Sequence, residues 1–135
     1  MDAFDADCLI YAAAPGHSLG VRVAALLDVQ PSGAGVNVGS TVLVPELLSK
    51  PIREKRLSEI RQLAFILSRL DLRPVDRAVA SLAAVLGARY RLRAADAIHL
   101  ATAVALGADR FITNNRRDFD RGQIAEIDIT YPDML

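Results

Sequence analysis

Short apolar segments alternate along this chain with longer segments whose apolar residues recur at helical spacing. Candidate strands end at Phe4 or cover residues 36–38, 72–75, 110–113 and 124–129, and candidate helices cover residues 18–29, 40–49, 54–70, 76–88 and 94–106. Strands that alternate with helices pair in parallel, because a parallel pair needs a crossover connection that a helix supplies. The pattern therefore predicts an α/β fold with a mostly parallel sheet and helices on both of its faces. No internal repeat or long linker divides the chain, so we expect a single domain over residues 1–135.

Individual residues set several of the expected boundaries. Ser40 and Asp76 are typical N-cap residues and precede two of the candidate helices. Gly87 and Gly107 are placed to end the fourth and fifth helices. Pro45 predicts a kink near the start of the second helix.

The composition is that of a folded protein without covalent staples. The hydrophobic fraction of 52% excludes disorder, and the single cysteine, Cys8, excludes both a disulfide framework and a structural zinc site. The first residues are acidic where a secretory signal would be basic, and no apolar run approaches the roughly 18 residues of a membrane span. We therefore expect a cytoplasmic protein that does not associate with a membrane.

The net charge of zero hides an uneven distribution. Residues 1–49 carry a net charge of −4, residues 50–93 a net charge of +7, and residues 94–135 a net charge of −3. Such a pattern fits either ordinary solvated helix faces or an acidic site beside a basic surface. The overall balance excludes tight, sequence-blind coating of a nucleic acid.

Four acidic residues stand where parallel α/β proteins carry their sites. Asp5 follows the first strand, and Asp118 follows the fourth. Glu46 lies in an otherwise apolar helix, and Asp96 lies in the first turn of a helix of small and apolar residues. Plainer alternatives exist for each acid. Asp5 could cap a helix, and Asp96 could interact with the positive helix end. Glu46 and Asp118 would then be solvated acids.

As a group, these carboxylates form a set of hard ligands. Together with Thr113 and Asn115 as neutral oxygen donors, they suit Mg²⁺ or Mn²⁺. Without a cation, their mutual repulsion would cost stability. The chemistry that uses such a cluster is the hydrolysis of phosphodiesters.

Four sequence strings carry a family resemblance. They are Asp5-Ala6-Asp7-Cys8-Leu9-Ile10, Val44-Pro45-Glu46-Leu47-Leu48, Ala95-Asp96-Ala97-Ile98-His99-Leu100-Ala101 and Thr113-Asn114-Asn115-Arg116-Arg117-Asp118-Phe119. In order and spacing, these strings resemble the PIN-domain family, and especially the VapC toxin ribonucleases. Asp7 departs from the family pattern, in which a small neutral residue, often Asn or Ser, is common.

The resemblance implies a three-layer α/β/α sandwich, a Mg²⁺- or Mn²⁺-dependent endoribonuclease, a homodimer and a VapB-like antitoxin as partner. It assigns metal binding and catalysis to Asp5, Glu46, Asp96 and Asp118. We expect Thr113 and Asn115 to support them by positioning bound water or the carboxylates, and Asp7 to be either an extra metal ligand or a residue that lines the site. Arg89, Arg91, Arg93, Arg116 and Arg117 are the candidates for contacts with RNA phosphates. His99, one turn after Asp96, is expected to pack or to form a hydrogen bond rather than to act as a catalytic acid or base.

Two other interpretations remain open at this point. The string Asp5-Ala6-Asp7 also resembles the first motif of haloacid-dehalogenase-like phosphatases, but that family needs a lysine after Thr113, and Lys50 and Lys55 both precede it. The second alternative is a catalytically silent PIN-like module that binds RNA or protein. The presence of all four acids disfavours it.

Overall fold

The computed structural model describes residues 1–28 and 36–135, and in these residues five strands form one sheet. The strands are β1 (Asp2–Phe4), β2 (Val38–Ser40), β3 (Asp71–Arg73), β4 (Arg110–Ile112) and β5 (Asp128–Thr130). Their order across the sheet is β3-β2-β1-β4-β5, and every neighbouring pair is parallel. The parallel sheet predicted from the alternation of segments is therefore confirmed.

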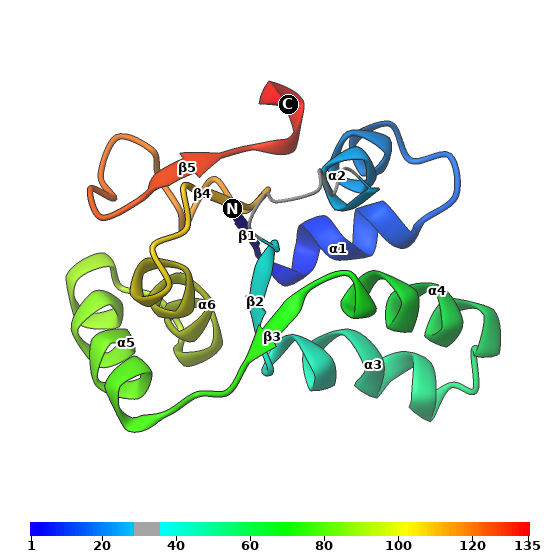
Figure 1. Ribbon diagram of the computed structural model, residues 1–135, viewed down its shortest axis with the longest axis horizontal. Coiled ribbons are helices and arrows are strands. Elements are labelled where there is room, and N and C mark those ends of the chain that lie inside the picture. The colour runs from blue at the N-terminus through cyan, green and yellow to red at the C-terminus, as the bar shows by residue number, and fades with distance from the viewer. Residues whose placement is uncertain (29–35) are drawn as a thin grey trace.

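Helices cover both faces of the sheet. They are α1 (Ala6–Ala13), α2 (Ser18–Asp28), α3 (Leu43–Arg53), α4 (Leu57–Ser68), α5 (Arg77–Tyr90), α6 (Ala94–Ala105) and the short 3₁₀ helix η1 (Pro132–Met134). Figure 1 shows α1 to α4 on one side of the sheet and α5 and α6 on the other. This arrangement is the expected α/β/α sandwich. In the described ranges, no helix combines the length and the apolar character that crossing a membrane requires.

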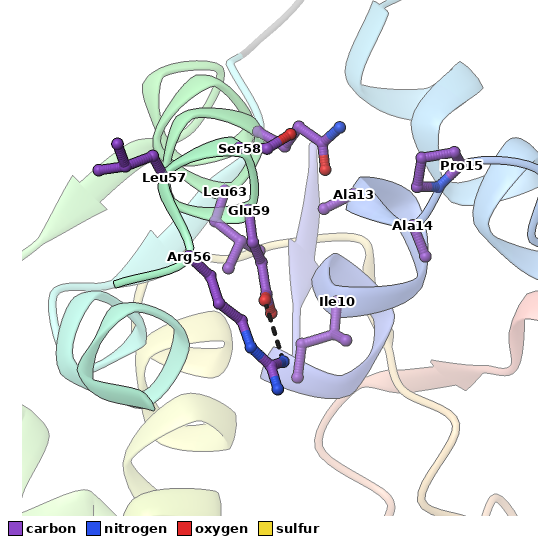
Figure 2. Close-up of a pocket in the computed structure, with 10 residues that line it drawn as sticks. Ile10, Ala13, Ala14, Pro15, Arg56, Leu57, Ser58, Glu59 and Leu63 are labelled. Atoms are coloured by element: carbon purple, nitrogen blue, oxygen red, sulfur yellow. Dashed lines mark hydrogen bonds and ion pairs between the residues drawn. The ribbon is translucent and has the colours of Figure 1, made fainter. Parts of the chain in front are cut away.

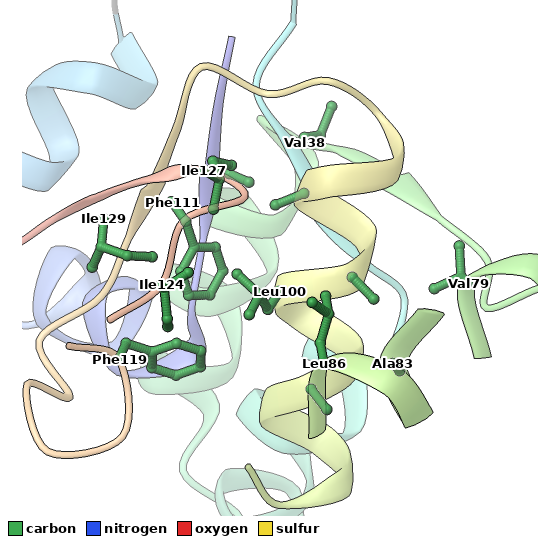
Figure 3. Close-up of a cluster of buried hydrophobic side chains, with 14 of the residues drawn as sticks. Val38, Val79, Ala83, Leu86, Leu100, Phe111, Phe119, Ile124, Ile127 and Ile129 are labelled. Atoms are coloured by element: carbon green, nitrogen blue, oxygen red, sulfur yellow. The ribbon is translucent and has the colours of Figure 1, made fainter. Parts of the chain in front are cut away.

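Residues that alternate along the central strands divide the core into two clusters. Ala3 and Phe111 belong to the cluster beneath α5 and α6, whereas Phe4 and Ile112 belong to the cluster beneath α1 to α4. Figure 3 shows Phe111 in the first cluster, with Leu100 of α6 beside it. Successive side chains of a strand point to opposite faces of the sheet, so each short central strand contributes to both layers.

Helix α1 was not predicted from the sequence. The sequence offers a helix here only through the alternative that Asp5 is a cap, and the segment is short and follows β1 after that single residue. Cys8 and Leu9 of this helix are fully buried against the sheet. Tertiary packing therefore stabilises a helix of eight residues that would be marginal in isolation.

Several expected boundaries were wrong by a few residues. The last strand begins at Asp128 rather than at Ile124, although Ile124 and Ile127 are buried. An apolar pattern does not distinguish a buried loop from a strand. The strands expected over 36–38 and 72–75 form at Val38–Ser40 and Asp71–Arg73 instead. Val29, the expected last residue of the first helix, lies outside the described residues.

The capping predictions met different outcomes. Asp76 caps α5, because its carboxylate accepts a hydrogen bond of 2.8 Å from the Val79 N–H. Ser40 ends β2, and α3 begins only at Leu43, which places Pro45 in the first helical turn, where a missing N–H breaks no helical hydrogen bond. Gly107 has a φ of +68° after α6, as expected for a helix stop.

Gly87 does not end α5, which continues to Tyr90. Its role is instead to allow close packing between two helices. A Cβ atom at Gly87 would lie 3.3 Å from the Cβ of Ala97, so the absence of a side chain lets α5 approach α6. This contact helps to hold the start of α6, which carries Asp96, against its neighbour.

Candidate metal centre at the carboxyl edge of the sheet

The four predicted acids lie on elements that begin where the parallel strands end. Asp5 connects β1 to α1, and Asp118 lies in the loop that follows β4. Glu46 and Asp96 occupy the first turns of α3 and α6. Because the strands are parallel, their carboxyl ends lie at one edge of the sheet, where α/β proteins bind ligands.

Asp5 is held by two hydrogen bonds in a buried position. Its Oδ1 accepts from the Ala6 N–H at 2.8 Å, and its Oδ2 accepts from the Thr113 hydroxyl at 2.9 Å. The residue is 5% exposed. Asp5 thus caps α1 and also contributes its carboxylate to the acidic edge, so the two interpretations offered by the sequence are compatible.

Burial and the neighbouring charge of Asp7 raise the pKa of Asp5 to about 6. The charge of His99 and the hydrogen bonds from Thr113 and Ala6 act in the opposite direction, with a smaller effect. A buried carboxylate that holds its proton this tightly lacks a compensating positive charge. A divalent cation would supply that charge.

A chain of hydrogen bonds connects Asp5 to Asp118 through the two supporting residues named from the sequence. The hydroxyl of Thr113, which donates to Asp5, accepts from the Asn115 N–H at 3.1 Å. The side-chain amide of Asn115 donates to Asp118 Oδ2 at 2.9 Å, and its Oδ1 accepts from the Asp118 N–H at 3.2 Å. Both carboxylates are therefore oriented by the same loop.

Asp7 binds the backbone of that loop. Its two carboxylate oxygens accept from the Asn114 N–H at 3.3 and 3.1 Å. The Asn114 side-chain amide lies 3.4 Å from the hydroxyl of Tyr11, one turn further along α1. Asp7 thereby fixes the loop after β4 against α1. Its negative charge is also the second cause, after burial, of the raised pKa of Asp5.

The remaining acids are linked by electrostatic repulsion. The pKa of Asp96 is raised, first by partial burial and then by the charges of Asp118 and Glu46, while His99 and Arg93 lower it. This coupling places acids from α3, α6 and the loop after β4 near one another. Carboxylates that repel one another in this way are a common feature of cation sites.

The donor set fits Mg²⁺ or Mn²⁺ by its chemistry, since all four acids supply hard oxygen ligands. The pKa values of two of them, Asp5 and Asp96, are raised by burial and by the charges of neighbouring acids. Across residues 1–28 and 36–135, no three His, Cys, Asp or Glu side chains are grouped so that they could hold a metal ion as they stand. The sequence predicted the edge at which the acids gather but not their individual orientations.

His99 forms a contact that the sequence did not specify. Its Nε2 lies 2.9 Å from Glu46 Oε2, and the side chain of His99 is fully buried while that of Glu46 is 29% exposed. The expectation that His99 packs or forms a hydrogen bond is confirmed. Its partner could not be predicted because Glu46 lies 53 residues earlier in the chain.

The predicted phosphate-binding arginines lie in different surroundings. Arg91 ends α5 with a φ of 55°, and Arg93 immediately precedes α6. Both are exposed, and Arg93 lies close enough to lower the pKa of Asp96. Arg117 is exposed in the loop that carries Asp118.

Arg116 and Arg89 contact other parts of the protein. The guanidinium of Arg116 lies 4.2 Å from the ring centroid of Tyr131 and forms an ion pair with Asp133. Arg89 forms an ion pair with Glu126. These interactions direct both side chains toward the C-terminal part of the chain.

An open groove lies apart from the four acids. Its volume is about 520 Å³, and it runs between the C-terminal half of α1 and the beginning of α4. Figure 2 shows Ile10 and Ala13 on one side and Leu63 on the other, with the ion pair between Arg56 and Glu59 (3.4 Å) beside them. The groove is lined mainly by apolar side chains, and none of the four predicted acids contributes to it.

Comparison with known proteins identifies the family. The model of the PIN domain matches residues 3–124. The chain belongs to the PIN-domain family. Of the two families suggested by the string Asp5-Ala6-Asp7, the match favours the PIN domain over the phosphatases.

Three solved structures of similar fold come from toxin–antitoxin complexes. A chain of a toxin–antitoxin complex from Klebsiella pneumoniae is 23% identical with a TM-score of 0.75, and the match covers 98% of each chain. A chain of VapBC2 from Rickettsia felis, bound to a DNA fragment from its promoter, is 18% identical with a TM-score of 0.75, covering 96% of this chain and 97% of that one. A chain of DNA-bound VapBC from Salmonella typhimurium is 22% identical with a TM-score of 0.69, covering 97% of each. At these identities the likeness shows the fold. No curated protein matches the sequence.

Proposed function

We propose that this PIN-domain protein is a Mg²⁺- or Mn²⁺-dependent endoribonuclease and the VapC-like toxin of a toxin–antitoxin pair. One observation carries the proposal. In a chain of this family, burial and the charges of Asp118 and Glu46 raise the pKa of Asp96, and hydrogen bonds through Thr113 and Asn115 connect Asp118 to the buried carboxylate of Asp5. Repulsion of this kind costs stability unless a cation offsets it, so a function must retain it.

Asp5, Glu46, Asp96 and Asp118 would hold the cation. A bound Mg²⁺ or Mn²⁺ supplies Lewis-acid chemistry, which activates water and offsets the negative charge that develops on the phosphate. The hydrogen bonds from Thr113 to Asp5 and from Asn115 to Asp118 orient two of the ligands before a cation arrives. Asp7 would act indirectly, because its carboxylate accepts a hydrogen bond from the Asn114 N–H and so anchors the loop that carries Thr113 and Asn115.

RNA would approach across an exposed basic rim. Arg91 and Arg93 lie just before the start of α6, and Arg117 lies next to Asp118. Arginine binds phosphate through two parallel hydrogen bonds, so these residues suit a polyanion that must be brought to an acidic centre. Arg116 contributes only if it leaves Tyr131 and Asp133. Binding is expected to be weak and sensitive to salt, because the chain as a whole is neutral.

The similar solved structures and the family resemblance support the proposed protein partners. The solved neighbours are toxin–antitoxin complexes, which supports a VapB-like antitoxin as the partner of this chain. We also propose a homodimer and a cytoplasmic location, in line with the family resemblance. Sedimentation that shows a monomer at high concentration would reject the dimer without affecting the nuclease proposal.

Cleavage of RNA by the purified protein tests the nuclease. Wild-type protein with Mg²⁺ or Mn²⁺ should cleave RNA, EDTA should abolish the cleavage, and the change Asp96→Asn should strongly reduce it. Asp28→Asn, an exposed aspartate at the end of α2, is the matched control and should remain active. Mapping of the RNA ends after expression of the wild type and of Asp96→Asn would identify the target.

The second candidate function is a catalytically silent module that binds RNA or protein. The groove between α1 and α4 favours it, because a protein partner could occupy this groove without any catalysis. That alternative predicts no cleavage with either metal. It also predicts that Asp5→Asn leaves the cellular phenotype unchanged.

A further inference from the structure

We propose that His99 is a positioning residue, which holds the carboxylate of Glu46 in place as a cation ligand by a hydrogen bond across the two helical layers. The inference rests on the proposed function, because Glu46 is a ligand only if the acidic edge binds a cation. It adds a specific role for a buried histidine that is not itself one of the acids. It parallels the hydrogen bonds by which Thr113 orients Asp5 and Asn115 orients Asp118.

The hydrogen bond joins elements on opposite faces of the sheet. Glu46 lies on α3, which covers one face together with α1 and α4, and His99 lies on α6, which covers the other face together with α5 (Figure 1). The distance from His99 Nε2 to Glu46 Oε2 is 2.9 Å. At the carboxyl edge, this bond therefore connects the Glu46 side chain of one helical layer to the buried His99 side chain of the other.

The chemistry of the pair defines which atom donates. An ionised carboxylate only accepts hydrogen bonds, so Nε2 of His99 carries the hydrogen. The bond engages Oε2 alone, and in the described part of the chain no hydrogen-bond donor is placed against Oε1 of Glu46. One oxygen is thus fixed by the protein while the other keeps its capacity to bind a cation. This arrangement is typical of ligands that are oriented by a residue outside the coordination shell.

The burial of His99 argues against a role in packing alone. The side chain is fully buried, yet its Nδ1 has no hydrogen-bond partner among the described residues. A buried polar atom without a partner costs stability, and an aliphatic side chain of similar size would avoid that cost. The histidine is therefore better explained by what its Nε2 does for Glu46 than by the stability it provides.

His99 is also close to two other acids. Its charge lowers the pKa of both Asp5 and Asp96. His99 follows Asp96 by three residues, which places the two side chains on the same face of α6. His99 thus lies on the face of α6 that carries Asp96, and its side chain contacts Glu46 of α3.

The test compares three substitutions in two measurements. His99→Leu removes the donor and also the unpartnered Nδ1. His99→Gln places an amide donor about as far along the side chain as Nε2, and His99→Asn keeps an amide that is too short to reach Glu46. Calorimetric titration with Mn²⁺ gives the affinity for the cation, and urea denaturation in EDTA gives the stability of the metal-free protein.

We expect His99→Leu and His99→Asn to weaken Mn²⁺ binding by about 10–100-fold, the range found when the partner of a metal ligand is removed. His99→Leu should be at least as stable as the wild type in EDTA, and His99→Gln should recover most of the affinity. In the Glu46→Gln background, His99→Leu should have little additional effect, because its target is already absent.

Three results overturn the inference alone, and the first two concern Mn²⁺ affinity. One is that His99→Leu binds Mn²⁺ as the wild type does. The other is that His99→Gln loses as much affinity as His99→Leu, which would indicate packing rather than donation. If the wild type itself binds neither Mn²⁺ nor Mg²⁺, the proposed function fails, and the role of His99 fails with it. A loss of stability in His99→Leu that is parallel to its loss of affinity also contradicts the inference.

Discussion

The two halves of the acidic edge are built in different ways. On the side of β1 and β4, Asp5 and Asp118 are connected through Thr113 and Asn115 by consecutive hydrogen bonds. On the side of the helices, Glu46 has one hydrogen bond to His99, and Asp96 interacts with its neighbours mainly through repulsion. The first half is organised by the polypeptide itself. The second half has fewer restraints, so a cation would have more influence on its final arrangement.

Loss of a ligand from either half should have the largest effect. Asp5→Asn and Asp96→Asn should each reduce the rate of RNA cleavage by about a hundredfold or more, because Lewis-acid stabilisation is worth several kcal/mol. Single-turnover kinetics over a titration with Mn²⁺ would measure the loss. Asp28→Asn is the control. If excess Mn²⁺ restores activity to Asp96→Asn but not to Asp5→Asn, the result supports the contrast between the two halves. Equal rescue of both would contradict it.

The organised half should be sensitive to the loss of its connecting residue. Asn115→Ala removes the hydrogen bonds that orient Asp118 and should weaken Mn²⁺ binding by about 10–100-fold. Calorimetric titration would measure the affinity. Asn114→Ala is a close control, since it keeps the backbone N–H that donates to Asp7 and loses only the side-chain amide near Tyr11. If the two variants bind Mn²⁺ equally well, the hydrogen-bond chain is not what organises this half.

The positions of the acids in the fold could be predicted from the sequence, whereas the contacts that distinguish the two halves could not. The order of strands and helices and the edge at which the acids gather follow from local periodicity and from the geometry of parallel sheets. The orientation of the acids does not. Glu46 meets His99 across two layers, and Arg116 turns to Tyr131, because these contacts depend on tertiary packing between distant residues. Helix α1 was missed for a related reason, since its eight residues are stabilised by burial of Cys8 and Leu9.

The buried acid of the organised half should make the metal-free protein sensitive to pH. The pKa of Asp5 in the folded chain is about 6, above its ordinary value of 3.8. Between these values the folded state binds more protons than the unfolded state, so stability falls as the pH rises through this window. The cost at pH 7 is up to about 3 kcal/mol.

Asp5→Asn should therefore raise the free energy of unfolding in EDTA by about 1–3 kcal/mol at pH 7 and have little effect near pH 4. The asparagine can still cap α1. Urea denaturation at the two pH values would measure the difference, and with saturating Mn²⁺ the wild type should become the more stable protein. If the variant is no more stable than the wild type at pH 7 in EDTA, burial of the ionised Asp5 carboxylate does not destabilise the protein.

The smallest expected effect concerns the connection between α5 and α6, in the less restrained half. Arg91 has a φ of 55°, a left-handed conformation that costs a non-glycine residue roughly 1–2 kcal/mol. Glycine would relieve this cost but loses about 0.5–1 kcal/mol through its greater freedom in the unfolded state. Arg91→Gly should therefore raise stability by less than about 1 kcal/mol. If Arg91 contacts a phosphate, the same change should reduce the salt dependence of RNA binding by about one unit of slope.

Lys55 provides a matched control for this last prediction. It has the same φ of 55° and lies in the turn between α3 and α4. Lys55→Gly should give a similar gain in stability without changing the salt dependence of RNA binding. The comparison separates backbone strain, which both residues share, from a contact with RNA, which we assign to Arg91. If both variants change the salt dependence equally, the basic rim extends beyond Arg91, Arg93 and Arg117 to the turn between α3 and α4. RNA would then approach the acidic edge over a broader surface that includes α3.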